Sequence, residues 1–286
     1  MTEAAGIFPA PAKLNLFLHV IGRRADGYHL LQSVLRLIDF GDEIGIAVRE
    51  DGEIHRTRAV TGVAEADDLC LRAANLLKLR TGSVLGADID LVKRLPVGGG
   101  VGGGSSDAAT VLLALNHLWK TGLSRAALQD LGAELGADVP FFIFGKSAFA
   151  EGVGERLTPV ALAPAWYLVL VPEVGVATRD IFSAADLARD AVPIRASEYI
   201  EGYGSNVLQP VTCGRFPEVA RHLAWLDSHG QARAGARMTG SGACVFISLD
   251  NERCARAALE SLPAGMRGLV ARGLDRHPLY QLAAGE

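Results

Sequence analysis

The sequence predicts a fold that mixes strands and helices, because two kinds of hydrophobic pattern follow one another along the chain. In residues 11–21, apolar and polar side chains alternate as they do in a half-buried strand. In residues 108–119, apolar side chains recur at the three- and four-residue spacing of a helix. With 286 residues, the chain can bury one large core or two modest ones.

The first half of the chain is expected to carry most of these elements. Strands are expected over residues 11–21, 34–40, 44–48 and 89–92, with a break at Gly41-Asp42, and a strand and turn over 150–155. Helices are expected over residues 69–79, 108–119 and 125–135, the last ended by Gly136. Residue types that favour helix starts precede them: Asp67-Asp68, then Ser105, Ser106 and Asp107, then Ser124.

A second half is expected to begin near residues 159–164. A continuous apolar strand covers 167–171 and ends at Pro172, and a helix opens at Thr178, which is expected to cap it. A tight glycine turn at 238–242 precedes another strand, and a late helix covers 252–261.

Composition narrows the class of protein. The net charge of −4 gives no support to a nucleic-acid surface, which shows a basic excess. Neither a signal peptide at residues 1–6 nor an apolar run long enough to span a bilayer is apparent, so no membrane partner is expected. The four cysteines form no Cys-x-x-Cys pair, which favours reduced thiols in a cytoplasmic protein.

The central feature is the glycine run 98–104, which leads directly into the helix expected over 108–119. A glycine loop before a helix presents free N–H groups and the positive end of the helix dipole, which suits a phosphate. A P-loop requires a lysine where this chain has Ser105, and a dinucleotide fingerprint requires a following strand and acid that are missing. A flexible linker is disfavoured, because the run is followed at once by an amphipathic helix.

Other polar residues are candidates for binding or chemistry, and each also has a simpler interpretation. Strand periodicity aims Lys13 and Asn15 at the same face, although exposed lysines are the norm. After a turn, Tyr28 offers a stacking face and His29 two ring nitrogens, although such a segment is surface by default.

The segment 136–140 is expected to form an irregular corner, because Val139 precedes Pro140 and is biased away from helical conformation. Asp138 at this corner could be an acid facing a substrate or simply a turn aspartate bonded to nearby backbone. Phe182 could likewise bind a ligand or fill the core.

Several motifs, in this order along the chain, resemble those of the GHMP kinases, a family that includes galactokinase, homoserine kinase and mevalonate kinase. They are Pro11-Ala12-Lys13-Leu14-Asn15-Leu16, the run 96–109, Gly136-Ala137-Asp138-Val139-Pro140 and Met238-Thr239-Gly240-Ser241-Gly242. The doubled glycine triplet and Arg24-Ala25-Asp26-Gly27-Tyr28-His29 resemble one branch, whose alcohol acceptor carries a cytidine diphosphate group.

The resemblance implies a fold of two α+β domains with the active site in the cleft between them. An N-terminal, ribosomal-S5-like ATP-binding domain would cover residues 1–160, and a C-terminal α/β sandwich domain would cover 161–286. The loop at 238–242 would brace the glycine run.

The resemblance also implies ATP and Mg²⁺ as cofactors and assigns roles to residues. Lys13 and Asp138 would be catalytic. The ATP phosphates would bind to Pro96, Val97, Gly98, Gly99, Gly100, Val101, Gly102, Gly103, Gly104, Ser105 and Ser106, with Ser106 approaching the metal. The substrate would contact Asn15, Tyr28, His29, Thr178, Phe182, Thr239 and Gly240, with Phe182 opposite Tyr28. Asp68 departs from the asparagine that is more frequent in the family near the adenine, and Lys93 could flank the base or be a solvated cation.

The implied reaction is ATP-dependent phosphorylation of the 2-hydroxyl of a methylerythritol that carries cytidine diphosphate, a step in non-mevalonate isoprenoid precursor biosynthesis. The alternatives are another GHMP kinase of the homoserine or mevalonate type, or a catalytically idle nucleotide-binding module.

Overall fold

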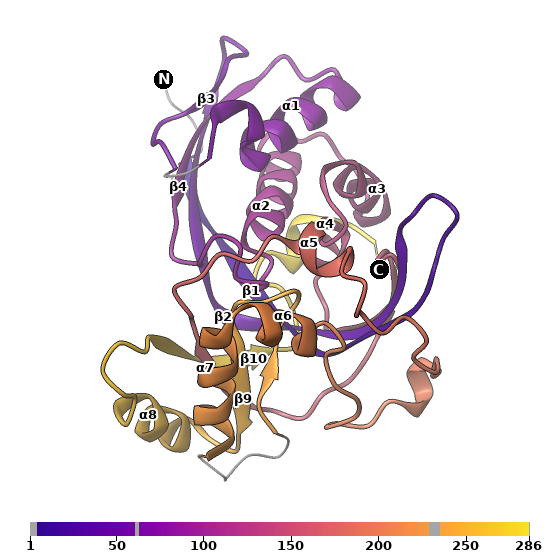
Figure 1. Ribbon diagram of the computed structural model, residues 1–286. Coiled ribbons are helices and arrows are strands. Elements are labelled where there is room, and N and C mark those ends of the chain that lie inside the picture. The colour runs from indigo at the N-terminus through magenta and orange to yellow at the C-terminus, as the bar shows by residue number, and fades with distance from the viewer. Residues whose placement is uncertain (1–4, 61–62, 229–234, 286) are drawn as a thin grey trace.

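The computed structural model describes residues 5–60, 63–228 and 235–285. Its strands form a ten-stranded sheet along the path β3-β4-β2-β10-β7-β9-β8, with β1 and β5 paired to β2 and β6 paired to β5. Helices α1 to α3 lie together on one side of the long strands, and α7 and α8 cover the other end of the molecule (Figure 1). Of residues 1–6, for which no signal peptide is expected, the first four lie outside the described residues.

The first half of the chain contains six strands and four α-helices among the residues described. The strands are β1 (Ala5–Arg23), β2 (His29–Arg49), β3 (Ile54–Arg56), β4 (Gly86–Val92), β5 (Ala148–Gly152) and β6 (Arg156–Pro159). The helices are α1 (Leu69–Thr81), α2 (Gly103–Leu118), α3 (Arg125–Leu135) and α4 (Val139–Phe144). A 3-10 turn, η1 (Glu65–Asp67), comes just before α1.

The second half adds strands β7 (Trp166–Leu170), β8 (Arg237–Met238), β9 (Val245–Leu249) and β10 (Gly268–Leu274). Its helices are α5 (Thr178–Phe182), α6 (Gln209–Arg215), α7 (Pro217–Ser228) and α8 (Glu252–Glu260), with 3-10 turns η2 (Ala196–Glu198) and η3 (Tyr280–Leu282). None of the helices within the described ranges is both long and apolar enough to cross a membrane.

Two hydrophobic cores correspond to the two halves. One packs α1 to α4 against β2 and β4, and the other packs α5 to α7 against β7 and β9. A third cluster joins them and includes Leu95 just before the glycine run and Val101 within it, together with Tyr167 and Phe246. The boundary at residue 160 stays a prediction, since β10 pairs with both β2 and β7 and the sheet is continuous.

The break expected at Gly41-Asp42 is wrong, because β2 continues through it. Gly41 pairs with Pro11, and a Cβ at Gly41 would lie 2.1 Å from the Ala10 carbonyl oxygen, so only glycine permits this approach. Asp42 is buried and accepts backbone hydrogen bonds from Arg94 and Leu95. A pair that resembles a turn locally is therefore held in a strand by tertiary contacts.

Two expected helix starts and the expected corner at 136–140 also need correction. Helix α2 begins inside the glycine run, with Gly102 as its N-cap, so Gly103 and Gly104 are helical and Ser105 to Asp107 lie in the first turns. The corner after Asp138 is a short helix, α4, because Pro140 lies in the first turn, where its missing N–H costs nothing. Ala177, rather than Thr178, precedes α5 as N-cap.

Candidate active site

A cavity of about 1090 Å³ is lined by residues from both halves of the chain. Its wall contains most of the residues singled out from the sequence: Lys13, Asn15, Tyr28, His29, Pro96, Val97, Gly98, Gly99, Gly100, Gly102, Gly103, Gly104, Ser105, Asp138, Thr178, Phe182 and Gly240. Val101, Ser106 and Thr239 are not on this wall. The fold therefore brings together side chains that are more than 200 residues apart in the sequence.

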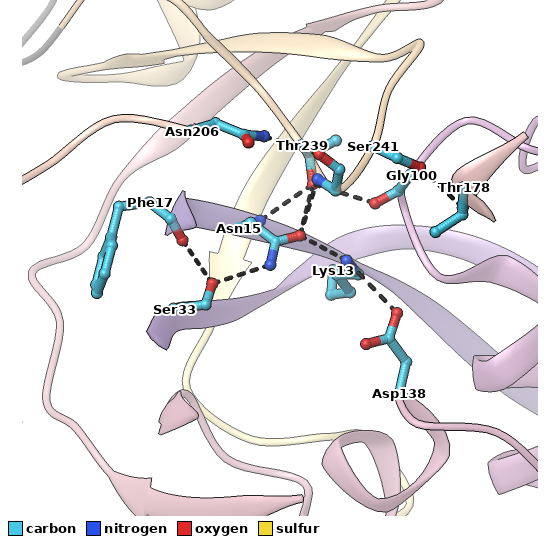
Figure 2. Close-up of polar contacts among 11 residues, drawn as sticks. Lys13, Asn15, Phe17, Ser33, Gly100, Asp138, Thr178, Asn206, Thr239 and Ser241 are labelled. Atoms are coloured by element: carbon cyan, nitrogen blue, oxygen red, sulfur yellow. Dashed lines mark hydrogen bonds and ion pairs between the residues drawn. The ribbon is translucent and has the colours of Figure 1, made fainter. Parts of the chain in front are cut away.

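Lys13 and Asp138 form an ion pair within this cavity, with 3.6 Å between Lys13 Nζ and Asp138 Oδ2 (Figure 2). The lysine side chain is 4% exposed, whereas that of Asp138 is 43% exposed. Lys13 comes from β1, and Asp138 is the N-cap residue of α4, where its side chain makes no capping bond. The carboxylate is thus held beside a cation and remains accessible to a ligand.

Asn15 fixes the position of Lys13 through a buried network (Figure 2). Its Oδ1 accepts hydrogen bonds from Lys13 Nζ at 2.5 Å and from the Gly240 N–H at 2.9 Å. Its Nδ2 donates to Ser33 Oγ at 2.9 Å, and its backbone N–H donates to Thr239 Oγ1 at 3.1 Å. Because the side-chain amide is engaged by protein groups, Asn15 connects β1 to the loop at 239–242 and helps to orient the lysine.

The glycine run has a backbone that other residues would not adopt. Gly98, Gly100 and Gly102 have φ of +71°, +75° and +73°, in the left-handed region. A Cβ on Gly100 would lie 2.2 Å from the Thr239 carbonyl oxygen, and one on Gly102 would lie 2.9 Å from the Phe142 ring. Alternating left-handed glycines point backbone N–H groups into a concave surface, which suits anionic oxygens.

The loop at 239–242 braces this run, as expected from the sequence. The Cys244 N–H donates to the Gly99 carbonyl at 3.1 Å, and Thr239 Oγ1 donates to the Gly100 carbonyl at 3.2 Å. Asn206 in turn donates to the carbonyls of Met238 and Gly240. The cavity wall therefore rests on contacts made by residues far along the chain.

Two residues assigned to phosphate or metal binding face the core instead. Ser106 is fully buried, and its Oγ donates to the Pro11 carbonyl at 2.7 Å, while Val101 packs in the cluster that joins the two halves. Of the two adjacent serines, Ser105 lies on the cavity wall. Among the residues that the structure describes, no group of three or more His, Cys, Asp or Glu side chains could hold a metal ion.

One end of the cavity lies beside the tip of the β1–β2 hairpin. Tyr28 is 64% exposed there, and the His29 and Phe182 rings lie 5.2 Å apart at 38°. The structure thus pairs Phe182 with His29. Thr178 and Ser241 also lie on the cavity wall. Their hydroxyl oxygens, Thr178 Oγ1 and Ser241 Oγ, are 2.8 Å apart and share a hydrogen bond (Figure 2).

His29 has a basic environment. Its pKa is lowered from 6.5 by burial and by the nearby charges of Arg189 and Arg23. Arg189 donates from Nε to His29 Nε2 at 3.1 Å, a contact that sequence reasoning missed. A lone arginine in a loop matches no spacing rule, so only the fold reveals this contact.

The opposite end of the cavity holds a buried charge cluster. Lys93 Nζ donates to Asp42 Oδ2 at 2.6 Å and to Asp107 Oδ2 at 2.7 Å. Burial raises the pKa of Asp107 to about 7, although the charge of Lys93 opposes this shift. The carboxylates of Asp42 and Asp107 thus share the Lys93 cation. Lys93 is thus neither isolated nor simply solvated.

Asp68 lies at the same end and has a structural task. Its Oδ1 accepts hydrogen bonds from the N–H groups of Cys70 and Leu71 as the N-cap of α1, and its Oδ2 pairs with Arg56 at 2.9 Å.

Comparisons with known proteins agree with this geometry. The GHMP kinases N terminal domain matches residues 68–146, and the GHMP kinases C terminal domain matches residues 185–268. The 4-diphosphocytidyl-2-C-methyl-D-erythritol kinase of Nitrosospira multiformis is 57% identical over 275 residues, covering 96% of this chain and 93% of that protein. The protein of the same name from Azoarcus sp. is 59% identical over 274 residues, covering 96% of each. A crystal structure of 4-(cytidine 5'-diphospho)-2C-methyl-D-erythritol kinase aligns with a TM-score of 0.81 at 35% identity, covering 94% of this chain and 99% of that one.

The two domain matches and the glycine loop between the halves define the chain as a GHMP kinase. Both of these relatives and the crystal structure are named as the same kind of kinase. Within the GHMP kinases, the chain belongs to the 4-diphosphocytidyl-2-C-methyl-D-erythritol kinase family.

Proposed function

We propose that this protein transfers the γ-phosphoryl group of ATP to the 2-hydroxyl of 4-diphosphocytidyl-2-C-methyl-D-erythritol, a step toward isoprenoid precursors. The observation that carries the proposal is the Lys13–Asp138 pair, which lies in one cavity with a phosphate-binding type of backbone and an aromatic wall. The family supplies the identity of the acceptor. A cytoplasmic location and the absence of a nucleic-acid partner remain predictions from the composition of the chain.

The glycine run would bind the ATP phosphates. Its left-handed glycines and the first turn of α2 direct backbone N–H groups and the positive end of the helix dipole toward the cavity. The backbone at Gly98–Gly100 and Gly102–Ser105 lines the wall, so we assign phosphate contact to these residues. Val101 and Ser106 support the loop from beneath.

Asp138 would accept the proton of the 2-hydroxyl while its oxygen attacks the γ-phosphorus and ADP leaves. A carboxylate that is partly exposed to the cavity, 3.6 Å from a buried lysine ammonium, is suited to this task. Lys13 would then neutralise negative charge that develops on the transferring group. Phosphoryl transfer depends mainly on such positioning and charge stabilisation.

Mg²⁺ would neutralise charge on the phosphates when bound, as it does in phosphoryl transfer generally. The donors on the cavity wall fit a metal held largely by substrate oxygens, because Mg²⁺ is commonly bound through phosphates with few protein ligands. Ser106, the serine that the resemblance assigns to the metal, donates its hydroxyl to the Pro11 carbonyl, whereas the neighbouring Ser105 lies on the cavity wall.

The cytosine ring would lie at the hairpin end of the cavity, against Tyr28, His29 and Phe182. These side chains offer stacking faces and a hydrogen-bonding ring within the same wall. Thr178 and Gly240 would contact the groups between the base and the erythritol, and Thr239 would act through the loop that it supports.

The direct test is consumption of ATP by purified protein with Mg²⁺ and each of three alcohols: the cytidine substrate, homoserine and mevalonate. We expect turnover with the cytidine substrate alone. Turnover with homoserine or mevalonate instead would keep the kinase site and refute the acceptor. Folded protein that binds ATP and consumes none would favour the idle nucleotide-binding module.

A further inference from the structure

Arg189 lies behind the wall of the cavity, in the loop after α5, and joins two parts of that wall. Its Nε donates to His29 Nε2 at 3.1 Å. Its Nη2 donates to the carbonyls of Phe182 and Ala184, at 3.2 and 2.6 Å, and its Nη1 donates to the Leu187 carbonyl at 2.9 Å. One planar guanidinium thus connects the start of β2 to the end of α5.

The contact with His29 determines where the imidazole carries its proton. A guanidinium has only donors, so the nitrogen that faces it, Nε2, must offer its lone pair. In a neutral imidazole the proton then lies on Nδ1. The ring is therefore held as a hydrogen-bond donor through Nδ1.

The contact with α5 has a separate consequence. The last carbonyls of a helix have no partner within the helix, and Phe182 and Ala184 lie at and just beyond the end of α5. Arg189 supplies donors to both. Because the Phe182 ring packs on His29 at 5.2 Å, the same arginine fixes both rings of the pair.

We propose that Arg189 is a positioning residue for the cytidine subsite, which holds His29 in the Nδ1–H form and pins the Phe182 segment beside it. The chemistry recognised would be a base edge with a hydrogen-bond acceptor, such as the ring nitrogen or carbonyl of cytosine. The inference deepens the proposed function and rests on it.

The charges around His29 make the proposal testable by pH. Arg189 from the loop and Arg23 from the end of β1 both lower the pKa of His29, after burial, while Asp26 and Arg179 line the same part of the cavity. Removing Arg189 would raise that pKa toward 6.5. It would also free the neutral ring to place its proton on Nε2, whereas protonation restores the hydrogen on Nδ1.

Arg189→Met removes every donor and keeps the apolar stem, and Arg215→Met is the matched control. Arg215 Nη1 also donates to a carbonyl of α5, that of Asp180 at 2.9 Å, and has no contact with His29 among those described. We expect Arg189→Met to raise KM for the cytidine substrate about tenfold, the loss typical of a hydrogen bond from a charged group. Turnover and KM for ATP should change less than about twofold, since the loss is in binding.

The distinguishing readout is the pH dependence of cytidine diphosphate binding, measured by calorimetry. Between pH 8 and pH 6, affinity in Arg189→Met should increase at least about twofold, because acid restores the Nδ1 donor. The wild type and Arg215→Met should not gain affinity. An Arg189→Met variant that is weakened equally at both pH values would show a packing role alone and overturn the proposal.

Nitrogen-15 NMR of the imidazoles gives a test that is independent of activity. The His29 signals, assigned by comparison with His29→Asn, should show the Nδ1–H tautomer in the wild type and a shift toward Nε2–H in Arg189→Met. If Arg189→Met does not fold, the wild-type spectrum still tests the inference, because the contact with Arg189 requires the Nδ1–H tautomer. A wild type in the Nε2–H form would refute the inference even if the kinase reaction is confirmed. A wild type that neither turns over the cytidine substrate nor binds cytidine diphosphate would overturn both.

Discussion

Lys13 Nζ lies 3.6 Å from Asp138 Oδ2, and the two side chains differ tenfold in exposure, at 4% and 43%. The Lys13 ammonium donates a hydrogen bond to Asn15 Oδ1, whereas the Asp138 carboxylate faces the cavity. In the proposed reaction this asymmetry would separate two tasks, because the fixed charge would stabilise the transition state and the accessible carboxylate would take the proton.

Lys13→Met and Asp138→Asn should each lower kcat by at least about 100-fold, the scale of a positioned acid–base group, while the fold is retained. Steady-state kinetics and circular dichroism would check both statements. Glu134→Gln is the control, since it removes one partner of an exposed ion pair with Arg80 that contributes little. Near-normal kcat in either cavity variant would remove that residue from the mechanism.

Asn15→Leu should lower the free energy of unfolding by about 3 kcal/mol or more and reduce kcat as well. The substitution removes hydrogen bonds to the Gly240 N–H and Ser33 Oγ, worth about 0.5–1.5 kcal/mol each, and one to the Lys13 ammonium, worth about 1.5–3 kcal/mol. Lys13 keeps Asp138 as a partner, and Ser33 keeps the Phe17 carbonyl. Urea denaturation measures the effect. Asn75→Leu on the exposed face of α1, where the amide bonds only to Leu71, should change stability by less than about 0.5 kcal/mol. Equal effects of the two substitutions would contradict the network.

Gly100→Ala should weaken ATP binding by more than the strain of a left-handed backbone at this position explains. Gly100 and Gly82 have φ of +75° and +68°, but only at Gly100 would a Cβ meet a neighbour, the Thr239 carbonyl at 2.2 Å. Gly82→Ala should therefore lose only the roughly 1–2 kcal/mol of a left-handed residue. Gly100→Ala should lose more stability and raise KM for ATP about tenfold, which corresponds to about 1.4 kcal/mol. An unchanged KM for ATP would argue against phosphate binding by this loop.

Local patterns predicted many of the helices and strands, and the resemblance to the GHMP kinases supplied many residues of the cavity wall, but neither predicted the long-range contacts. Helix α3 and its Ser124 cap follow the prediction, because capping is a relation between neighbours in sequence. Gly41-Asp42 was mistaken for a break, since its reasons to stay in a strand come from Ala10 and Arg94. The resemblance places Ser106 near the metal, although helical geometry turns its hydroxyl toward the Pro11 carbonyl.

We expect His277 to make the folded protein less stable in acid, and a substitution at this position should remove that effect. It is almost fully buried, and burial, followed by the charge of Arg125, lowers its pKa to about 3. Because this folded-state pKa lies below the unfolded value of 6.5, the unfolded chain binds an extra proton between these two pH values. The free energy of unfolding should therefore fall as pH drops below 6.5, with up to about 1.4 kcal/mol per pH unit from this group. His277→Asn keeps an acceptor for the Leu279 N–H but cannot titrate, so its stability should fall less steeply between pH 6 and pH 4.5. Any packing loss is a constant offset that measurements at pH 8 reveal, and parallel curves for the two proteins would show that His277 is not the group responsible.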